Sequence, residues 1–327
     1  MTTRRLTALL LLFVLLPLLP LAEEAPLDPG FPPLTPEGFL PPGQEEFVFI
    51  DAVHGKWRFV NQDLRIEITR HEDKSIPLRW LGAEIFTRAG TPGFKMVSHD
   101  REHMLESRSR YTEKPAVIAR NNGLVFSMDG DYFLYRVHAA KTNKRKLAIG
   151  VVIRDREVLV DNPASEKRNL YPPLDMLALF PDGDMRVYKA REQTAQELLD
   201  LGAVDVLSFG PWLVRDGQLN DTYSTYGTTI QPRAAIGMVE KGHYWAVIVE
   251  GRTRLSAGMT TFEVGELMRD LGCTLAFNLD GGWTSAMVFM GKQLNQLDRT
   301  GVHDNARPQN EVMGIGRTTA FEEGRAP

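Results

Sequence analysis

The residues best suited to chemistry in this sequence lie in the segment 278–282, which reads Asn-Leu-Asp-Gly-Gly. Asp280 follows an apolar stretch, where a carboxylate can act as a base or a nucleophile. Gly281 and Gly282 allow backbone N–H groups to approach a bound molecule closely or to form an anion-binding turn. Asn278 lies two residues before Asp280, so on a strand both side chains point to the same face. An Asp-Gly turn without a function is the alternative, because such turns are common.

Three charged residues outside this segment are further candidates. Asp129 and Asp131 share a face if the chain is extended there, and either could supply a second carboxylate. Their alternative role is a turn whose acids are solvated. Arg233 opens another apolar stretch, and its fork of donors matches phosphate oxygens. A salt bridge at the start of a strand is the alternative for Arg233.

The residues after the Asp-Gly-Gly turn could complete a binding site. Thr284 and Ser285 supply hydroxyl groups suited to phosphate or sugar contacts, and Trp283 offers an aromatic face for a sugar ring. Cys273, the single cysteine, allows no intramolecular disulfide. Because it precedes an apolar strand, Cys273 is expected to be a small buried hydrophobic residue rather than a nucleophile.

A zinc site is a possible alternative in the segment 99–103, which reads His-Asp-Arg-Glu-His. On a helix, His99 and His103 would share a face, as in some zinc peptidases. The segment is highly charged and has no evident third ligand nearby, so a solvated helical face is the expected outcome. The sequence therefore predicts no metal ligands, although Asp-rich loops would permit a divalent cation such as Ca²⁺.

The pattern of apolar residues predicts the elements that would position these side chains. The stretch 192–201 is expected to form a helix, as is 262–271, which would be capped by Thr260 and end at Gly272. The second helix leads directly into a buried strand over 275–279. Three hairpins are predicted over 147–160, 177–188 and 234–250. Together these elements predict an α+β fold in a single main domain, with a mixed, hairpin-rich β-sheet and a few inserted helices.

Composition limits the classes of partner. The chain has 327 residues, 43% of them hydrophobic, which is enough to build a sizeable core. Its formal net charge is −4, and no basic run is present, so no field attracts nucleic acid. An acidic protein of this kind is not expected to bind DNA or RNA.

The N-terminus is typical of an exported protein. Arg4 and Arg5 precede an apolar run that ends near Ala22, so residues 1–22 are predicted to be a signal peptide. If the signal is left uncleaved, it would tether the protein to a membrane. Residues 23–44 contain seven prolines between positions 25 and 43 and are expected to form an extended linker. The main domain is placed at 45–327, and the protein is expected to be secreted or extracytoplasmic.

Four ordered motifs resemble the phosphodiester glycosidase family. They lie at 209–217, 233–237, 258–260 and 278–285, and the segment 125–133 is similar to an earlier element of the family. The clearest match spans 148–316. The family includes an N-acetylglucosamine-1-phosphodiester α-N-acetylglucosaminidase, and its bacterial members are associated with exopolysaccharide biosynthesis. This sequence departs from the family at Asp129, where Asn is usual, and after Gly282, where Trp-Thr-Ser stands in place of Gly-Ser.

The resemblance implies a hydrolase that releases sugar from a glycosyl phosphodiester, acting on a phosphate-linked sugar or an envelope glycan. Arg233 would neutralise the phosphate, and Asp280 would activate water or attack the anomeric carbon, with Asp129 or Asp131 as the second carboxylate. No cofactor would be required. Two alternatives remain at this point: a non-catalytic protein that binds envelope glycans, and a zinc metallopeptidase that uses His99 and His103.

Overall fold

The computed structural model describes residues 30–103, 111–131, 150–162, 174–224, 228–298 and 304–321. The predicted signal peptide and residues 23–29 of the predicted linker lie outside these ranges, so export stays a prediction. Residues 132–133 of the early family element and 147–149 of the first predicted hairpin also lie outside them. Within the described residues, no helix has the length and apolar character needed to cross a bilayer.

The part of the predicted linker that the structure describes is packed. It contains no strand or helix, yet Phe39 and Leu40 are buried, and the Leu40 N–H donates to the Asn61 carbonyl at 2.9 Å. The compact unit that contains the sheets accordingly begins at Phe31. The prolines favour an extended chain, but burying these apolar side chains stabilises the packed arrangement.

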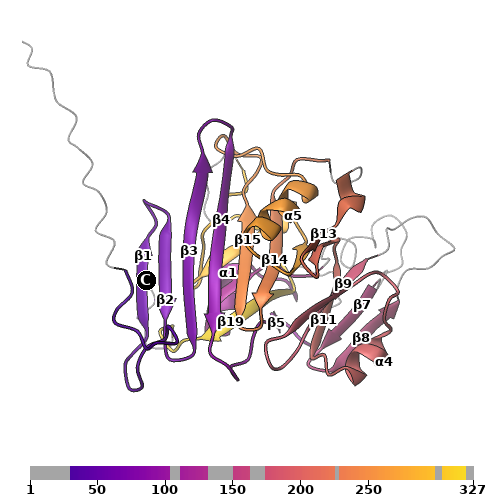
Figure 1. Cartoon of the computed structure of the whole chain (residues 1–327), viewed down its shortest axis with the longest axis horizontal. Coiled ribbons are helices and arrows are strands. Elements are labelled where there is room, and N and C mark those ends of the chain that lie inside the picture. Colours follow the sequence, from indigo (N-terminus) through magenta and orange to yellow (C-terminus); the bar gives the residue numbers. More distant parts are fainter. Residues whose placement is uncertain are drawn as a thin grey trace, which may run out of the picture. The chain divides into compact units, whose positions relative to one another are not determined.

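The strands form three antiparallel sheets in the described residues (Figure 1). The nine-stranded sheet has the order β1 (Phe47–Asp51), β2 (Lys56–Val60), β3 (Leu64–Asp73), β4 (Leu78–Thr87), β15 (His243–Val249), β14 (Arg233–Glu240), β16 (Leu275–Leu279), β12 (Trp212–Arg215) and β13 (Gln218–Leu219). A five-stranded sheet has the order β10 (Met185–Tyr188), β9 (Asp175–Leu179), β11 (Asp205–Phe209), β7 (Gly150–Arg154) and β8 (Glu157–Asn162). The other has the order β18 (Lys292–Gln293), β17 (Met287–Phe289), β6 (Leu124–Met128), β19 (Glu311–Arg317) and β5 (Lys95–Ser98).

The α+β fold and its hairpins are confirmed. The pairs β7–β8, β9–β10 and β14–β15 are the three predicted hairpins, and β16 is the predicted buried strand. The sheets are not mixed, however, because every strand pair in the described residues is antiparallel. Short turns join many successive strands, and a short turn can only connect antiparallel neighbours.

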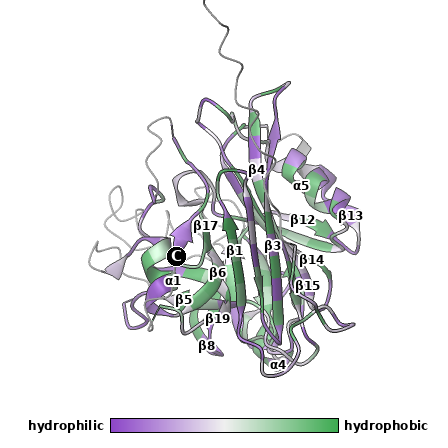
Figure 2. Ribbon diagram, turned by 90° about the vertical axis from the view of Figure 1, so that its left-hand side faces the viewer, coloured by the Kyte–Doolittle hydropathy of each residue, from purple (hydrophilic) through white to green (hydrophobic). Residues whose placement is uncertain are grey.

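The α-helices of the described residues are short: α1 (Pro115–Asn121), α4 (Ala195–Asp200) and α5 (Thr261–Asp270). Capping boxes begin α4 and α5, whereas α1 has no side-chain cap. The predicted capping box at Thr260 is confirmed, since its side chain accepts from the Glu263 N–H while the Glu263 carboxylate accepts from the Thr260 N–H. In Figure 2, α5 carries hydrophobic and hydrophilic residues in turn along its length. Val264 and Met268 are its buried apolar residues, and they fix the helix against the sheet.

The two faces of the nine-stranded sheet have different cores. One face packs against both smaller sheets in a single large cluster, which includes Phe59, Phe126, Leu177 and Phe277. The other face is covered by α5 over β12, β14 and β16. Cys273 lies in this second core, where burial raises the pKa of its thiol to about 12. It is the small buried residue that its position predicts.

A buried ion network ties the sheets together around Arg154, the last residue of β7. Its guanidinium is 1% exposed and contacts Asp131 at 2.9 Å and Glu311 of β19 at 2.5 Å. Two further hydrogen bonds go from the Arg154 Nη1 to the carbonyls of Ile153 and Val206. Burial alone would lower the pKa of Arg154, but the charges of Glu311 and Asp131 raise it, so the group stays ionised.

Replacing Arg154 should therefore destabilise the protein strongly. Arg154→Met leaves two buried carboxylates without their cation, and breaking a buried pair in this way costs roughly 3–5 kcal/mol of unfolding free energy. Urea unfolding would measure the loss. The control is Arg186→Met, because the Arg186 side chain is 47% exposed in its pair with Asp184 and should cost at most about 1 kcal/mol. Equal losses in the two variants would contradict the role given to Arg154.

Candidate active site

Two of the predicted site residues lie at the same end of two neighbouring strands in the nine-stranded sheet. In the antiparallel pair of β14 and β16, Ala234 stands opposite Leu279. Arg233 and Asp280 lie one step beyond this pair and are therefore neighbours across the strands. The sequence placed both at the ends of apolar stretches, and the register of the sheet brings them together.

The Asp-Gly-Gly turn is shaped by contact with the chain before β14. A Cβ on Gly281 would lie 2.8 Å from the Pro232 carbonyl oxygen, so no larger residue fits without a shift. Gly282 has φ +69°, which glycine adopts readily. The Gly282 N–H donates to the Pro232 carbonyl at 3.0 Å. This N–H is therefore used within the protein, and the glycines allow a close approach of two backbone segments. Substrate binding by Gly281 and Gly282 stays a prediction.

Asp129 lies at the end of β6 and is fully buried. Its Oδ1 accepts from the Ala286 N–H at 2.9 Å, and its Oδ2 has no hydrogen-bond partner among the described residues. Burial raises the pKa of Asp129 well above its ordinary value, and the charge of nearby Asp280 raises it further, against the effect of the Ala286 hydrogen bond. The two carboxyl groups interact, and burial together with the charge of Asp280 favours the neutral form of Asp129.

Asp131 has a different environment. The strand ends at Met128, so the period of two that would align Asp129 with Asp131 does not apply. The Asp131 carboxylate accepts from the Ser208 N–H at 3.1 Å and pairs with Arg154. It is buried rather than solvated, and its contacts make it an anchor for the loop that carries Asp129.

Arg233 forms no salt bridge within the described residues, so the expected alternative for it is not found. Its Nε donates to the Met259 carbonyl at 3.1 Å, and its Nη2 donates to the Thr229 carbonyl. Burial lowers the pKa of Arg233 to about 10, and the charge of Arg252 contributes to the shift. At neutral pH the guanidinium is still charged, and a bound anion would offset both effects.

Arg252 is the residue that sequence reasoning missed. Its exposed guanidinium donates to the Gln231 side chain and lies 5.8 Å from the centre of the Trp283 ring. It also faces the turn, since a Cβ on Gly282 would be 3.5 Å from its Nη2. The predicted hairpin over 234–250 could have indicated this position, because its second strand ends opposite Arg233 and brings the residues after 250 close to it.

The remaining predicted residues surround this group. The Asn278 Nδ2 donates to the Gly210 carbonyl at 2.8 Å, while its Oδ1 and the Ser285 Oγ are buried without a hydrogen-bond partner in the described part of the chain. Buried polar atoms generally require a partner, so both are suited to contact a sugar. The Thr284 hydroxyl instead donates to the Gly281 carbonyl and closes the turn. Trp283 is 38% exposed, as a stacking platform would be.

The structure does not support the helix that the zinc alternative requires. Residues 99–103 form bends and a turn rather than a helix, so His99 and His103 do not share a helical face. His103 contacts Asp100 through its Nδ1 and stacks on Tyr111 with ring centres 4.0 Å apart. Across the described ranges, no group of three or more His, Cys, Asp or Glu residues is arranged to hold a metal ion.

The sequence profile of the phosphodiester glycosidase family matches residues 115–315, which include Asp129, Arg233, Arg252 and Asp280. The chain belongs to this family. The catalytic domain of zebrafish N-acetylglucosamine-1-phosphodiester alpha-N-acetylglucosaminidase shares the fold, with a TM-score of 0.57 and 17% identity over 78% of this chain and 83% of that one. A hypothetical protein from Synechocystis has a TM-score of 0.50 and 12% identity over 78% of this chain and 62% of that one.

A sequence relative, like the Synechocystis protein, is described without an activity. The SPbeta prophage-derived uncharacterized protein YomE of Bacillus subtilis (strain 168) is 33% identical over 152 residues. The match covers 46% of this chain and 23% of YomE, so the chain spans less than a quarter of that relative. The family membership therefore establishes a phosphodiester glycosidase domain, and its substrate has to be argued from the site.

The buried neutral state of Asp129 predicts a pH dependence of stability. The folded protein keeps a proton on Asp129 that the unfolded chain releases above a pKa of about 3.9, so stability falls as pH rises from there to the raised pKa. Asp129→Asn, which is neutral at all pH values, should gain stability relative to the wild type over this window, by up to about 1.4 kcal/mol per pH unit. Unfolding curves from pH 4 to 8 would measure it. The exposed Asp161→Asn is the control, and parallel profiles for all three proteins would contradict the prediction.

Proposed function

We propose that this protein is an exported enzyme that hydrolyses a glycosyl phosphodiester and releases a sugar and a phosphate monoester. The observation that carries this proposal is the position of Arg233 and Arg252 beside the Asp280–Asp129 pair. Two adjacent guanidinium groups repel each other unless an anion lies between them, and the side-chain hydrogen bonds of both arginines go to carbonyl and amide oxygens in the described residues. Family membership supports the same class of reaction.

The arginines would act on the leaving group. A phosphate monoester is stable as an anion, so cleavage of the bond between the anomeric carbon and the ester oxygen needs charge neutralisation more than protonation. Both guanidinium groups can donate paired hydrogen bonds to phosphate oxygens. Charge that develops on the ester oxygen would be stabilised by donors already in place.

The carboxyl groups would act on the sugar. Asp280 accepts a proton from water as the water oxygen bonds to the anomeric carbon, and the phosphate leaves with the electron pair of the broken bond. Asp129 keeps its proton and donates a hydrogen bond to the sugar. Its neutral state matters for affinity, since a second negative charge beside a phosphodiester would oppose binding.

The proposal includes an expected location and cofactor requirement. We expect export by the N-terminal segment 1–22, and we expect the carboxyl and guanidinium groups to suffice without a metal ion. A phosphate-linked sugar of an envelope glycan is the proposed substrate class.

Asp280→Asn should abolish most of the activity while leaving the fold intact. Loss of a general base typically lowers the rate about 10²–10⁴-fold. The assay is sugar release from a panel of sugar-1-phosphodiesters, with and without EDTA, and thermal unfolding checks the fold. Full activity in the variant would exclude Asp280 as the base. Tight glycan binding by the wild-type protein without any turnover would favour the non-catalytic alternative.

Arg252→Lys tests the phosphate contact. Lysine keeps the charge but loses the fork of donors, so we expect the KM for a phosphodiester and the inhibition constant of product phosphate to rise roughly tenfold. The matched control is Arg254→Lys, an exposed arginine two residues away. If both variants retain the wild-type KM, Arg252 does not contact the phosphate.

A further inference from the structure

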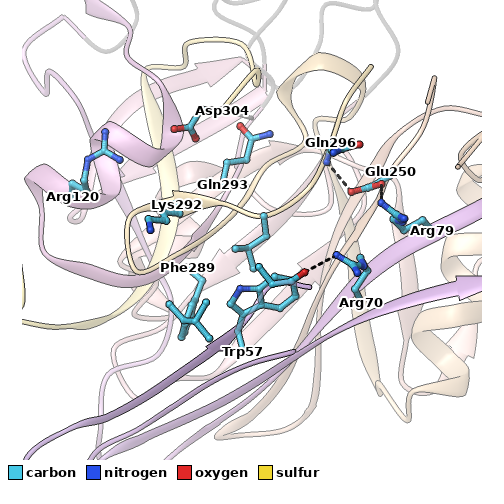
Figure 3. A pocket seen from close by; sticks show the side chains of 13 residues that line it. Trp57, Arg70, Arg79, Arg120, Glu250, Phe289, Lys292, Gln293, Gln296 and Asp304 are labelled. Carbon is cyan, nitrogen blue, oxygen red and sulfur yellow. Dashed lines mark hydrogen bonds and ion pairs between the residues drawn. The ribbon is translucent and has the colours of Figure 1, made fainter. Parts of the chain in front are cut away.

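A pocket lies at the same end of the strands as the candidate active site (Figure 3). Its volume is about 480 Å³, within the range of roughly 300–1,000 Å³ typical of small-ligand sites. It is formed at one end of the strands β2, β3, β4 and β15 and by the hairpin β17–β18. Trp57 and Phe289 form an apolar side, and Arg79 and Glu250 lie on the opposite side from Arg120 and Lys292.

Glu250 carries an unused acceptor into this pocket. The side chain follows the end of β15 and is 1% exposed. Its Oε1 accepts from the Gln296 N–H at 2.7 Å, whereas its Oε2 is buried with no hydrogen bond in the described residues. The nearest cation is the Arg79 Nη1 at 3.8 Å, and the Arg79 Nε is likewise a buried donor without an acceptor there. A buried acceptor beside a buried donor matches the hydroxyl groups of a sugar.

The opposite wall of the pocket is cationic. The Arg120 Nη1 donates to the Gly291 carbonyl at 2.6 Å, and Lys292 is exposed at the mouth. Neither is paired with a carboxylate in the described part of the chain. Asp304 also lines this side, but the lining cations outnumber the lining acids. The wall therefore favours a ligand with a negative charge.

The chain connects this pocket to the active site over two residues. Glu250 lines the pocket, and Arg252 belongs to the pair of guanidinium groups beside Asp280. Between them, Gly251 packs so closely that a Cβ would lie 2.7 Å from the Pro232 nitrogen. Two residues span at most about 7 Å. A glycan with its anomeric phosphate at Arg252 has its next unit within reach of the pocket.

We propose that this pocket is a subsite for an anionic sugar unit of the phosphate-linked glycan, one unit away from the bond that is cleaved. The hydroxyl groups of that unit contact Glu250 and Arg79, its apolar face lies toward Trp57, and its phosphate or carboxylate contacts Arg120 and Lys292. The assignment rests on the proposed function for its place in catalysis, while the binding chemistry of the pocket stands on the pocket residues alone.

Binding tests the pocket without any turnover. Calorimetry on the full chain would compare glucose 6-phosphate, glucuronic acid, glucose and inorganic phosphate. We expect the two anionic sugars to bind, and Lys292→Ala and Glu250→Gln each to weaken their binding at least tenfold. The control is Lys241→Ala, which removes an exposed lysine from the hairpin β14–β15. Equal binding of the anionic sugars by the Lys292→Ala variant and the wild type would overturn the proposal, as would a loss of inorganic phosphate binding in Lys292→Ala as large as the loss for the sugars.

Kinetics tests the place of the pocket in the reaction. Two substrates are compared: a diester with an anionic sugar next to the cleaved unit, and a methyl diester. The preference for the first, measured as the ratio of the two kcat/KM values, should fall about tenfold in Lys292→Ala. An unchanged ratio in an active enzyme would show that the pocket is not a subsite. Absence of turnover on every diester, with the anionic sugars still bound in a Lys292-dependent manner, would instead reject the proposed function and keep the binding site.

Discussion

The arrangement of the active site depends on the buried ion network of Arg154. This guanidinium joins the end of β7, the start of β19 and the loop after β6 through its contacts with Glu311 and Asp131. A buried charge that is 1% exposed needs its partners in place, so the network holds the three segments together. Asp129 lies two residues before Asp131, on the loop that this network anchors.

The site itself combines pairs of like charges that are unfavourable on their own. Burial and the charge of Asp280 both raise the pKa of Asp129. Arg233 and Arg252 repel each other in the same way. In the proposed function, a sugar joined to a phosphate would offset both: its hydroxyl groups would form hydrogen bonds at the carboxyl pair, and its phosphate would neutralise the guanidinium pair.

The pocket that Glu250 lines lies at the same end of the strands as the active site. Asn295 accepts from the Met287 N–H and donates to the Ser285 carbonyl, so the segment after the Asp-Gly-Gly turn is fixed on both sides. Glu250 is bound to the neighbouring Gln296. These hydrogen bonds connect the segment after the turn to the residues that line the pocket.

The sequence by itself determined the local elements and the family. The capping box at Thr260, the strand before Asp280 and the hairpins were readable because each depends on residues close in the chain. It also singled out Asp280, Arg233 and Asp129, which have chemical types suited to the reaction. Only the tertiary structure separated Asp131 from Asp129, brought Arg252 to the turn and left Glu250 facing a pocket. These outcomes depend on sheet register and on buried charges that find partners far away in the sequence, and no local pattern encodes such pairings.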